Sequence, residues 1–164
     1  MQADFVAQFL RLCKEEGLHT ALDTSGCAAW REFEKVLPYT DIFLYDVKHM
    51  NPQEHQKLTG VGNRLVLENL KKLFALGAQV EIRMPVIPGL NDGDENIRQL
   101  AEFLAGEKTL KRICPLPYHA LSGSKYEAIG KNHAMPAVTG EELAAACRVA
   151  DFLSARGLPV RIPE

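Results

Sequence analysis

Residues 41–48 read Asp-Ile-Phe-Leu-Tyr-Asp-Val-Lys, and this alternating stretch decides the fold predicted for the whole chain. Successive side chains of a strand point to opposite faces of its sheet. One face then carries Ile42, Leu44, Asp46 and Lys48, and the other carries Phe43, Tyr45 and Val47. The pattern predicts a strand with one wholly apolar face, whose other face ends in a carboxylate and an ammonium.

In sheets built from strand–helix crossovers, ligands bind beyond the carboxyl ends of the strands. Asp46 and Lys48 are therefore the first candidates for chemistry. The alternative is a solvated ion pair at a strand end, which contributes about 0–1 kcal/mol. Both interpretations stay open on this stretch alone, and the rest of the chain decides between them.

Strands and helices alternate on both sides of residues 41–48. Expected strands cover residues 18–22, 41–48, 79–87, 111–114 and 158–162, and four of the expected helices end in a glycine just before a strand. That order predicts an α/β fold of the partial (β/α) barrel type. It would be an open, curved, mainly parallel sheet of about five strands with helices on its outer face.

Five strands cannot close an eight-stranded barrel, and the chain opens on a crossover helix where such a series normally opens on a strand. We therefore expect an upstream part of the barrel to be absent from this sequence. Residues 18–22 would then form an edge strand with unpaired backbone, which predicts self-association through that edge.

Composition and charge bound the class of protein. A chain of 164 residues fits a single domain, residues 1–164, and can bury about 70% of the surface that its unfolded chain exposes. The net charge is -2, and scattered lysines and arginines form no patch for nucleic acid. No apolar run approaches the roughly 18 residues of a membrane span, and no signal-peptide pattern is present. The sequence predicts a cytoplasmic protein without membrane or nucleic-acid partners.

The four cysteines, at positions 13, 27, 114 and 147, are far apart in the sequence. They form no C-x-x-C or similar pair, so no zinc or iron–sulfur spacing is present. Each is expected to be a small buried apolar residue, except Cys27, which follows the polar turn of residues 23–26. The glycine-rich nucleotide loops, the G-x-S-x-G elbow and H-E-x-x-H are also absent.

Ionisable groups end the first four expected strands. These groups are Asp23, then Asp46 with Lys48, then Arg83, then His119. Sites on barrel-type sheets have this distribution, because each strand end contributes one or two groups. Singly, each has a structural alternative: Asp23 as a turn residue, Arg83 paired with Glu81, His119 held by a backbone carbonyl. Jointly they favour one shared pocket.

Several of these strand ends resemble the successive motifs of the glycyl-radical enzyme activating enzymes. The motifs are residues 19–26 (His-Thr-Ala-Leu-Asp-Thr-Ser-Gly), 46–50 (Asp-Val-Lys-His-Met), 83–89 followed by Asn91-Asp92, and 116–119 (Leu-Pro-Tyr-His) followed by residues 123–126 (Gly-Ser-Lys-Tyr). They occur in the family's order and spacing. The resemblance extends from about Gly17 to Ile162.

That resemblance implies radical S-adenosylmethionine chemistry on a partial barrel. In the family, a [4Fe-4S] cluster on a C-x-x-x-C-x-x-C loop reduces S-adenosylmethionine, and the 5′-deoxyadenosyl radical removes a hydrogen atom from a glycine of a partner glycyl-radical enzyme. Its members are oxidoreductases of the pyruvate formate-lyase activating type. The implied protein partner is therefore a glycyl-radical enzyme, which this sequence does not identify.

The resemblance also implies roles for individual residues. Asp46, Val47 and Lys48 resemble the segment that holds the ribose and carboxylate end of S-adenosylmethionine, and His119 resembles the histidine beside its adenosine. A monovalent-cation site next to the cofactor is implied at Asp23, Thr24, the carbonyl of Leu44 and Asp46. Arg83 resembles an arginine near the partner's glycine loop.

Two family motifs are missing from this chain. Neither C-x-x-x-C-x-x-C nor the Gly-Gly-Glu motif that receives the methionyl amino group is present. The chain thus resembles the carboxyl-terminal part of an activase. We expect it to hold no cluster, to bind S-adenosylmethionine weakly or not at all, and to be inactive alone. The alternatives are a non-catalytic half-barrel that binds a protein or nucleotide, and a barrel-type aldolase or hydrolase using Lys48, or Asp23 with Asp46.

Overall fold

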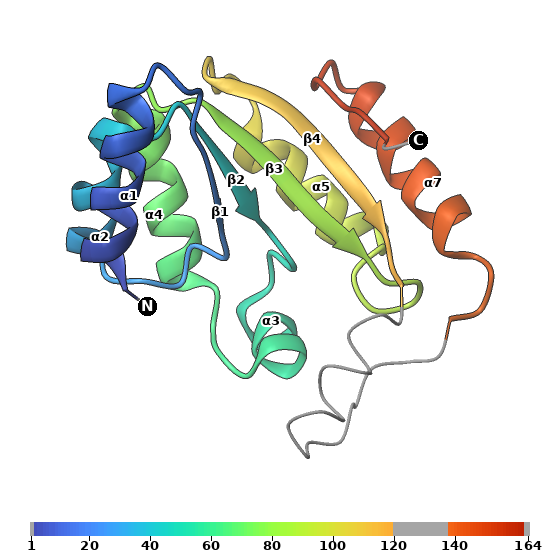
Figure 1. Cartoon of the computed structure of the whole chain (residues 1–164). Coiled ribbons are helices and arrows are strands. Elements are labelled where there is room, and N and C mark those ends of the chain that lie inside the picture. Colours follow the sequence, from blue (N-terminus) through green and yellow to red (C-terminus); the bar gives the residue numbers. More distant parts are fainter. Residues whose placement is uncertain (1, 120–137, 163–164) are drawn as a thin grey trace.

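The computed structural model describes residues 2–119 and 138–162. The elements, in chain order, are α1 (Ala3–Glu15), β1 (Ala21–Thr24), α2 (Trp30–Val36), η1 (Leu37–Tyr39), β2 (Ile42–Asp46), α3 (Pro52–Thr59), α4 (Arg64–Ala75), β3 (Val80–Val86), α5 (Asp94–Leu104), β4 (Leu110–Pro117) and α7 (Glu142–Ser154) (Figure 1). Residues 123–126, part of the fourth motif, lie outside the described residues.

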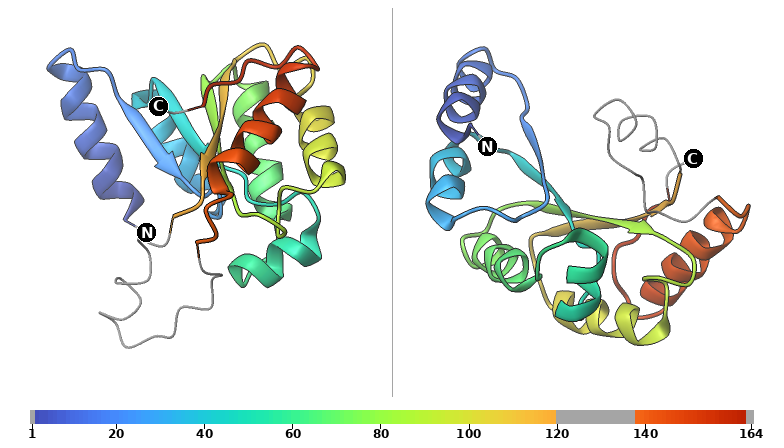
Figure 2. Two further views of the ribbon diagram at one scale, coloured as in Figure 1. Left: turned by 90° about the vertical axis from the view of Figure 1, so that its right-hand side faces the viewer. Right: turned by 90° about the horizontal axis from the view of Figure 1, so that it is seen from below.

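The four strands form one parallel sheet in the order β1-β2-β3-β4. The helices line one side of this curved sheet, and among the described residues its opposite face carries none (Figure 2). The predicted α/β fold, an open parallel sheet with helices on one side, is therefore confirmed. Since β1 pairs only with β2, its other edge is free among the described residues.

The expected fifth strand is reduced to one isolated bridge, so the described sheet has four strands where about five were predicted. Val160 bridges Ile113 of β4 in parallel. The Ile113 N–H donates to the Pro159 carbonyl at 2.7 Å, and the Arg161 N–H donates back to Ile113 at 2.9 Å. Pro159 has no N–H with which to extend this ladder by another residue, which explains its length.

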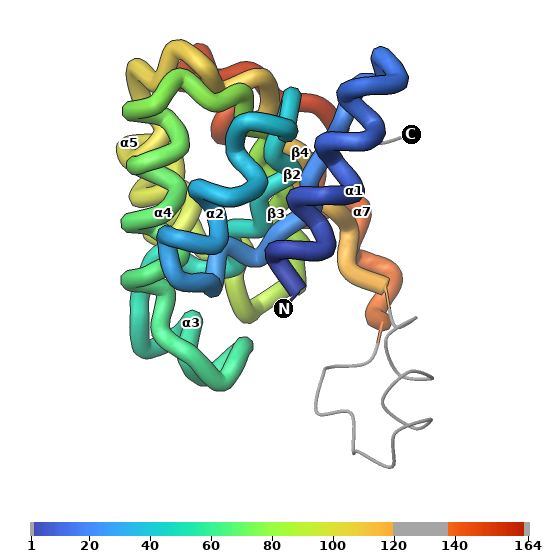
Figure 3. The backbone as a smooth tube through the Cα atoms, turned by 60° about the vertical axis from the view of Figure 1, so that its left-hand side comes forward, coloured from blue at the N-terminus to red at the C-terminus, as the bar shows by residue number. Residues whose placement is uncertain are grey.

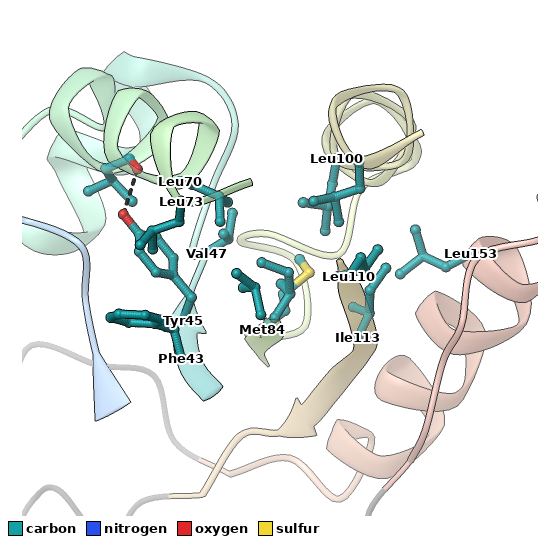
Figure 4. Close-up of a cluster of buried hydrophobic side chains, with 14 of the residues drawn as sticks. Phe43, Tyr45, Val47, Leu70, Leu73, Met84, Leu100, Leu110, Ile113 and Leu153 are labelled. Atoms are coloured by element: carbon teal, nitrogen blue, oxygen red, sulfur yellow. Dashed lines mark hydrogen bonds between the residues drawn. The ribbon is translucent and has the colours of Figure 1, made fainter. Parts of the chain in front are cut away.

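The core lies between the sheet and the helices that cover it. Phe43, Tyr45 and Val47 of the predicted apolar face are at most 3% exposed and pack with residues of α4, β3, α5, β4 and α7 (Figure 4). The Tyr45 hydroxyl donates a hydrogen bond to the Val66 carbonyl at 2.7 Å. Burial raises the pKa of Tyr45. Buried and half-buried residues alternate along β2, so the predicted two-residue alternation of this strand is confirmed.

Helix α1 leaves several of its apolar side chains exposed. It packs against α2 (Figure 3), and Leu10 is only 6% exposed. Phe5, Phe9 and Leu12 are nevertheless 64%, 55% and 52% exposed. No helix among the described residues is long and apolar enough to span a membrane.

Candidate functional site

The polar face of the sheet carries four of the predicted site residues near the carboxyl ends of its strands. Strand period and register place them there: Asp23 is paired in register with Leu44, and Asp46 with Arg83. Asp23, Leu44, Asp46 and Arg83 thus share the face opposite the buried Phe43 and Tyr45. Three of the four strands for which the sequence predicted a shared pocket therefore contribute side chains to one polar surface.

Asp23 and Arg83 form an ion pair across the intervening strand β2. The Arg83 Nη1 donates to Asp23 Oδ2 at 2.5 Å, so side chains of β1 and β3 meet above Leu44. The Asp23 side chain is 59% exposed and the Arg83 side chain 31%. Both groups are accessible to a ligand, although each already neutralises the other.

Arg83 does not pair with Glu81, although the sequence left that pair open as an alternative. A register shift between Val80 and Glu81 sets Glu81 opposite Arg112 on β4, and the two side chains form an ion pair. The Cys114 thiol also donates to Glu81, with 3.4 Å between sulfur and oxygen. Burial, reinforced by the Glu81 carboxylate, raises the pKa of the Cys114 thiol to about 11.

Asp46 and Lys48 form a second ion pair, at the end of β2. The Lys48 ammonium lies 2.7 Å from Asp46 Oδ2, and the two side chains are 34% and 24% exposed respectively. Lys48 lies two residues beyond Asp46, the last residue of the strand, so its side chain reaches back along its own chain to the carboxylate. This geometry leaves one charged group of each sign at the rim of the polar face.

The other residues implied by the family resemblance are distributed unevenly. Val47 has its side chain in the core, 3% exposed, so only its main chain can face a ligand. Thr24 ends β1, and its Oγ1 accepts the Gly26 N–H at 3.1 Å. His119 is exposed just beyond β4 at the same end of the sheet, and within the described chain no hydrogen bond joins it to the other site residues.

Gly26 closes the turn after β1 in a way that only glycine permits. Its φ is +74°, and a Cβ built there would lie 2.0 Å from the Tyr45 hydroxyl oxygen. The turn therefore packs its backbone directly on the buried ring of Tyr45. Asn69 of α4, which is fully buried, secures the same turn by donating to the carbonyls of Gly26 and Ala28 at 2.9 and 2.8 Å.

Buried asparagines are the part of this site that the sequence analysis missed. Besides Asn69, the side chains of Asn63, Asn91 and Asn96 are at most 6% exposed and hydrogen-bond to main-chain groups of the strand-end loops. Asn91 appeared only as part of a motif. A buried amide between two loops leaves no periodic signal, because its partners are distant in sequence.

A monovalent cation fits this site only after rearrangement. Two carboxylates, a threonine hydroxyl and a main-chain carbonyl are the oxygen ligands that hard cations prefer. In this structure, however, Asp23 is engaged by Arg83 and Asp46 by Lys48. The described residues also include no group of three or more His, Cys, Asp or Glu side chains placed to hold a metal.

The cysteines do not fit an iron–sulfur cluster. Cys13 lies on α1, Cys27 in the turn after β1, Cys114 on β4 and Cys147 on α7, and all four are free. A [4Fe-4S] cluster needs thiolates gathered around one centre. The cysteines of this chain therefore supply no cluster site, in agreement with the absence of the three-cysteine motif from the sequence.

Comparison with known proteins identifies relatives of this chain. Residues 1–104 match the family model described as the radical SAM superfamily. The chain is 39% identical over 142 residues to the trans-4-hydroxy-L-proline dehydratase activating enzyme of Clostridioides difficile, covering 85% of this chain and 45% of that protein. It is 38% identical over 140 residues to the pyruvate formate-lyase 1-activating enzyme of Escherichia coli K12, covering 84% and 57% respectively.

Solved structures give the same result for the fold. A domain of a pyruvate-formate lyase-activating enzyme from Bacteroides vulgatus superposes with a TM-score of 0.80 at 27% identity, covering 99% of this chain and 92% of that one. Streptococcus suis SuiB, at 15% identity and a TM-score of 0.73, shares the fold. The chain spans about half the length of the curated relatives it matches.

Proposed function

This chain belongs to the radical SAM superfamily. From that membership we propose that it forms the part of a glycyl-radical enzyme activase that holds the ribose and carboxylate end of the cofactor. Its homologues are glycyl-radical enzyme activating enzymes, among them activases of dehydratases and of pyruvate formate-lyase. In such a protein the partner is another protein, and the product is a radical on one of its glycines.

One observation carries this proposal: the Asp46–Lys48 pair and the Asp23–Arg83 pair share the polar face at the carboxyl end of the sheet. S-adenosylmethionine presents a carboxylate, ribose hydroxyls and a positive sulfonium. The Lys48 ammonium suits the carboxylate, and the Asp46 oxygens suit the hydroxyls as acceptors. His119, exposed at the same end, would lie beside the adenine.

The chemistry that the family cofactors supply, reductive cleavage of S-adenosylmethionine, needs a [4Fe-4S] cluster that the cysteines of this chain do not fit. We therefore propose that the isolated chain is inactive and that its affinity for S-adenosylmethionine is weak. Its own residues would orient the ligand: Lys48 and Asp46 would hold the ribose and carboxylate end, and the core side chain of Val47 would fix the main chain between them.

Arg83 supports a role in contact with the partner. Its guanidinium lies on the open face of the sheet, and among the residues that the structure describes its one ion-pair partner is the more exposed Asp23. We propose that a partner loop or a bound cation displaces one side chain of this pair from the other. The cation's ligands would be Asp23, Thr24, Asp46 and the Leu44 carbonyl. Such an exchange is inexpensive, because exposed ion pairs contribute only about 0.2–1 kcal/mol.

Self-association is proposed for the isolated chain through the free edge of β1. Phe5, Phe9 and Leu12 of the neighbouring helix α1 are exposed and apolar, and an unpaired strand edge is a template for further pairing. Sedimentation velocity over a range of concentrations measures it. Replacing Phe9 by Glu should shift the population toward monomer, and a wild-type chain that stays monomeric at all concentrations would contradict the proposal.

Isothermal titration with S-adenosylmethionine tests the proposed function. Binding by the wild-type chain should weaken at least about tenfold in Lys48→Met and Asp46→Asn, since each removes one charged contact. Glu81→Gln is the matched control, because it changes a carboxylate of the same sheet face that pairs with Arg112 instead. Binding that is unchanged in both site variants would exclude this face as the cofactor site and favour a non-catalytic binding module.

A further inference from the structure

The three residues that follow Val47 are held by asparagine side chains from other elements. The β2 strand ends at Asp46, so beyond it no long ladder satisfies the main chain. Asn91 donates to the Lys48 carbonyl at 3.0 Å, and Asn96 accepts the Met50 N–H at 2.8 Å. Asn63 donates to the carbonyls of His49 and Met50 at 3.0 and 2.6 Å. Every residue from Lys48 to Met50 is thus anchored.

Asn91 joins this segment to the end of the neighbouring strand β3. Its Nδ2 also donates to the Pro85 carbonyl at 2.7 Å, and its Oδ1 accepts the Ile87 N–H at 2.8 Å. Asn96 in turn donates to the Asn91 carbonyl at 2.7 Å. Asn91 is 2% exposed, so these bonds lie in a region where they do not compete with water.

Only an amide satisfies the groups around position 91. One side chain there donates to two carbonyls and accepts one N–H, which a carboxylate cannot do because it has no donor. A leucine of similar size would leave three main-chain groups buried without partners. The amide therefore fixes the separation and direction of the two strand ends as well as their burial.

The consequence falls on Lys48, whose carbonyl is one of the three groups that Asn91 holds. A lysine side chain has large rotamer freedom, so the direction of its ammonium depends on a fixed backbone. With that backbone anchored, the Lys48 ammonium lies 2.7 Å from Asp46 Oδ2. We propose that Asn91, supported by Asn63 and Asn96, is a positioning residue that aims Lys48 at the carboxylate end of the adenosyl ligand. This inference rests on the proposed function of Lys48.

Asn91→Asp tests the inference, with Asn69→Asp as its matched control. Each replacement removes two donors to buried main-chain carbonyls, but Asn69 holds the turn at Gly26 and Ala28 rather than Lys48. Asn96→Asp is a milder second variant, since it removes the bond to the Asn91 carbonyl and keeps an acceptor for Met50. It stays informative if Asn91→Asp does not fold.

The first measurement needs no ligand: NMR of the 15N-labelled lysine ammonium groups. A protected Lys48 signal, hydrogen-bonded to Asp46, should be present in the wild type and in Asn69→Asp. It should be lost in Asn91→Asp and weakened in Asn96→Asp. A Lys48 signal that persists unchanged in Asn91→Asp would show that Asn91 only stabilises the fold, and would overturn the inference.

The second measurement compares two ligands that differ in the carboxylate-bearing end: S-adenosylhomocysteine and 5′-methylthioadenosine. The wild type should prefer the first, and Asn91→Asp should reduce that preference about tenfold while Asn69→Asp retains it. A preference retained in Asn91→Asp refutes the positioning role. A wild type without any preference refutes the proposed role of Lys48 instead, and the Lys48 signal then decides the positioning role independently.

Discussion

Replacement of Gly26 by alanine should be among the most damaging single-methyl changes in this chain. Gly26 has a φ of +74°, and an added Cβ would meet the Tyr45 side chain at 2.0 Å from its hydroxyl oxygen and 2.3 Å from the adjoining ring carbon. Tyr45 is fully buried and donates its hydroxyl to the Val66 carbonyl. Neither the turn nor the ring can therefore move without losing packing.

Three costs add in Gly26→Ala. A left-handed alanine costs about 1–2 kcal/mol, and forcing extra volume into a packed core costs about 1–3 kcal/mol. Displacing the Tyr45 hydroxyl leaves the Val66 carbonyl without its partner, which costs about 1–3 kcal/mol. Even with the lower figure for each, the free energy of unfolding should fall by about 3 kcal/mol.

Urea unfolding followed by the fluorescence of Trp30, the one tryptophan of the chain, measures this loss. The midpoint should move down by about 1–3 M urea. Gly77→Ala is the matched control, because Gly77 has nearly the same φ, +75°, and nothing within 4 Å of an added Cβ. It should lose only the backbone cost. Equal losses in the two variants would refute the packing of this turn on Tyr45.

Further predictions concern single contacts. Asn69→Ala leaves the Gly26 and Ala28 carbonyls without their donor, so hydrogen exchange should accelerate in residues 24–30, and unchanged exchange would contradict the anchoring. Arg83→Gln should alter the free energy of unfolding by less than about 1 kcal/mol, because its pair with Asp23 is exposed; a larger loss in urea unfolding would assign the pair a structural role. The Lys14 ammonium and the Thr20 N–H lower the pKa of Asp41 to about 2, below its unfolded value of about 3.9. Stability from this group should be present above about pH 4 and lost as the pH falls toward 2, and Asp41→Asn should flatten that part of the curve of unfolding free energy against pH.

Much of this site could be predicted because it follows from strand period. Alternation in residues 41–48 placed Asp46 opposite the core, and strand ends placed Asp23 and Arg83 on the same face. The partner of Arg83 could not be predicted. It depends on the register shift beside Glu81, which aligns Glu81 with Arg112, and on the reach of Arg83 across β2 to Asp23.

The contacts of the buried asparagines could not be predicted from the sequence. Asn91 meets Lys48, and Asn96 meets Met50, across 43 and 46 positions of sequence. No local period encodes contacts between loops at such separations. The shortened last strand was more accessible to prediction, since Pro159 within residues 158–162 already removes a ladder donor.

In the proposed function, the polar rim formed by Asp46 and Lys48 with Asp23 and Arg83 receives an adenosyl ligand. The most direct test is a map of amide chemical-shift changes as S-adenosylhomocysteine is added to the 15N-labelled chain. The changes should be concentrated at residues 23–26 and 46–50, with little change on α4 or α5. Changes confined to the helical side of the sheet, or none at millimolar ligand, would contradict it.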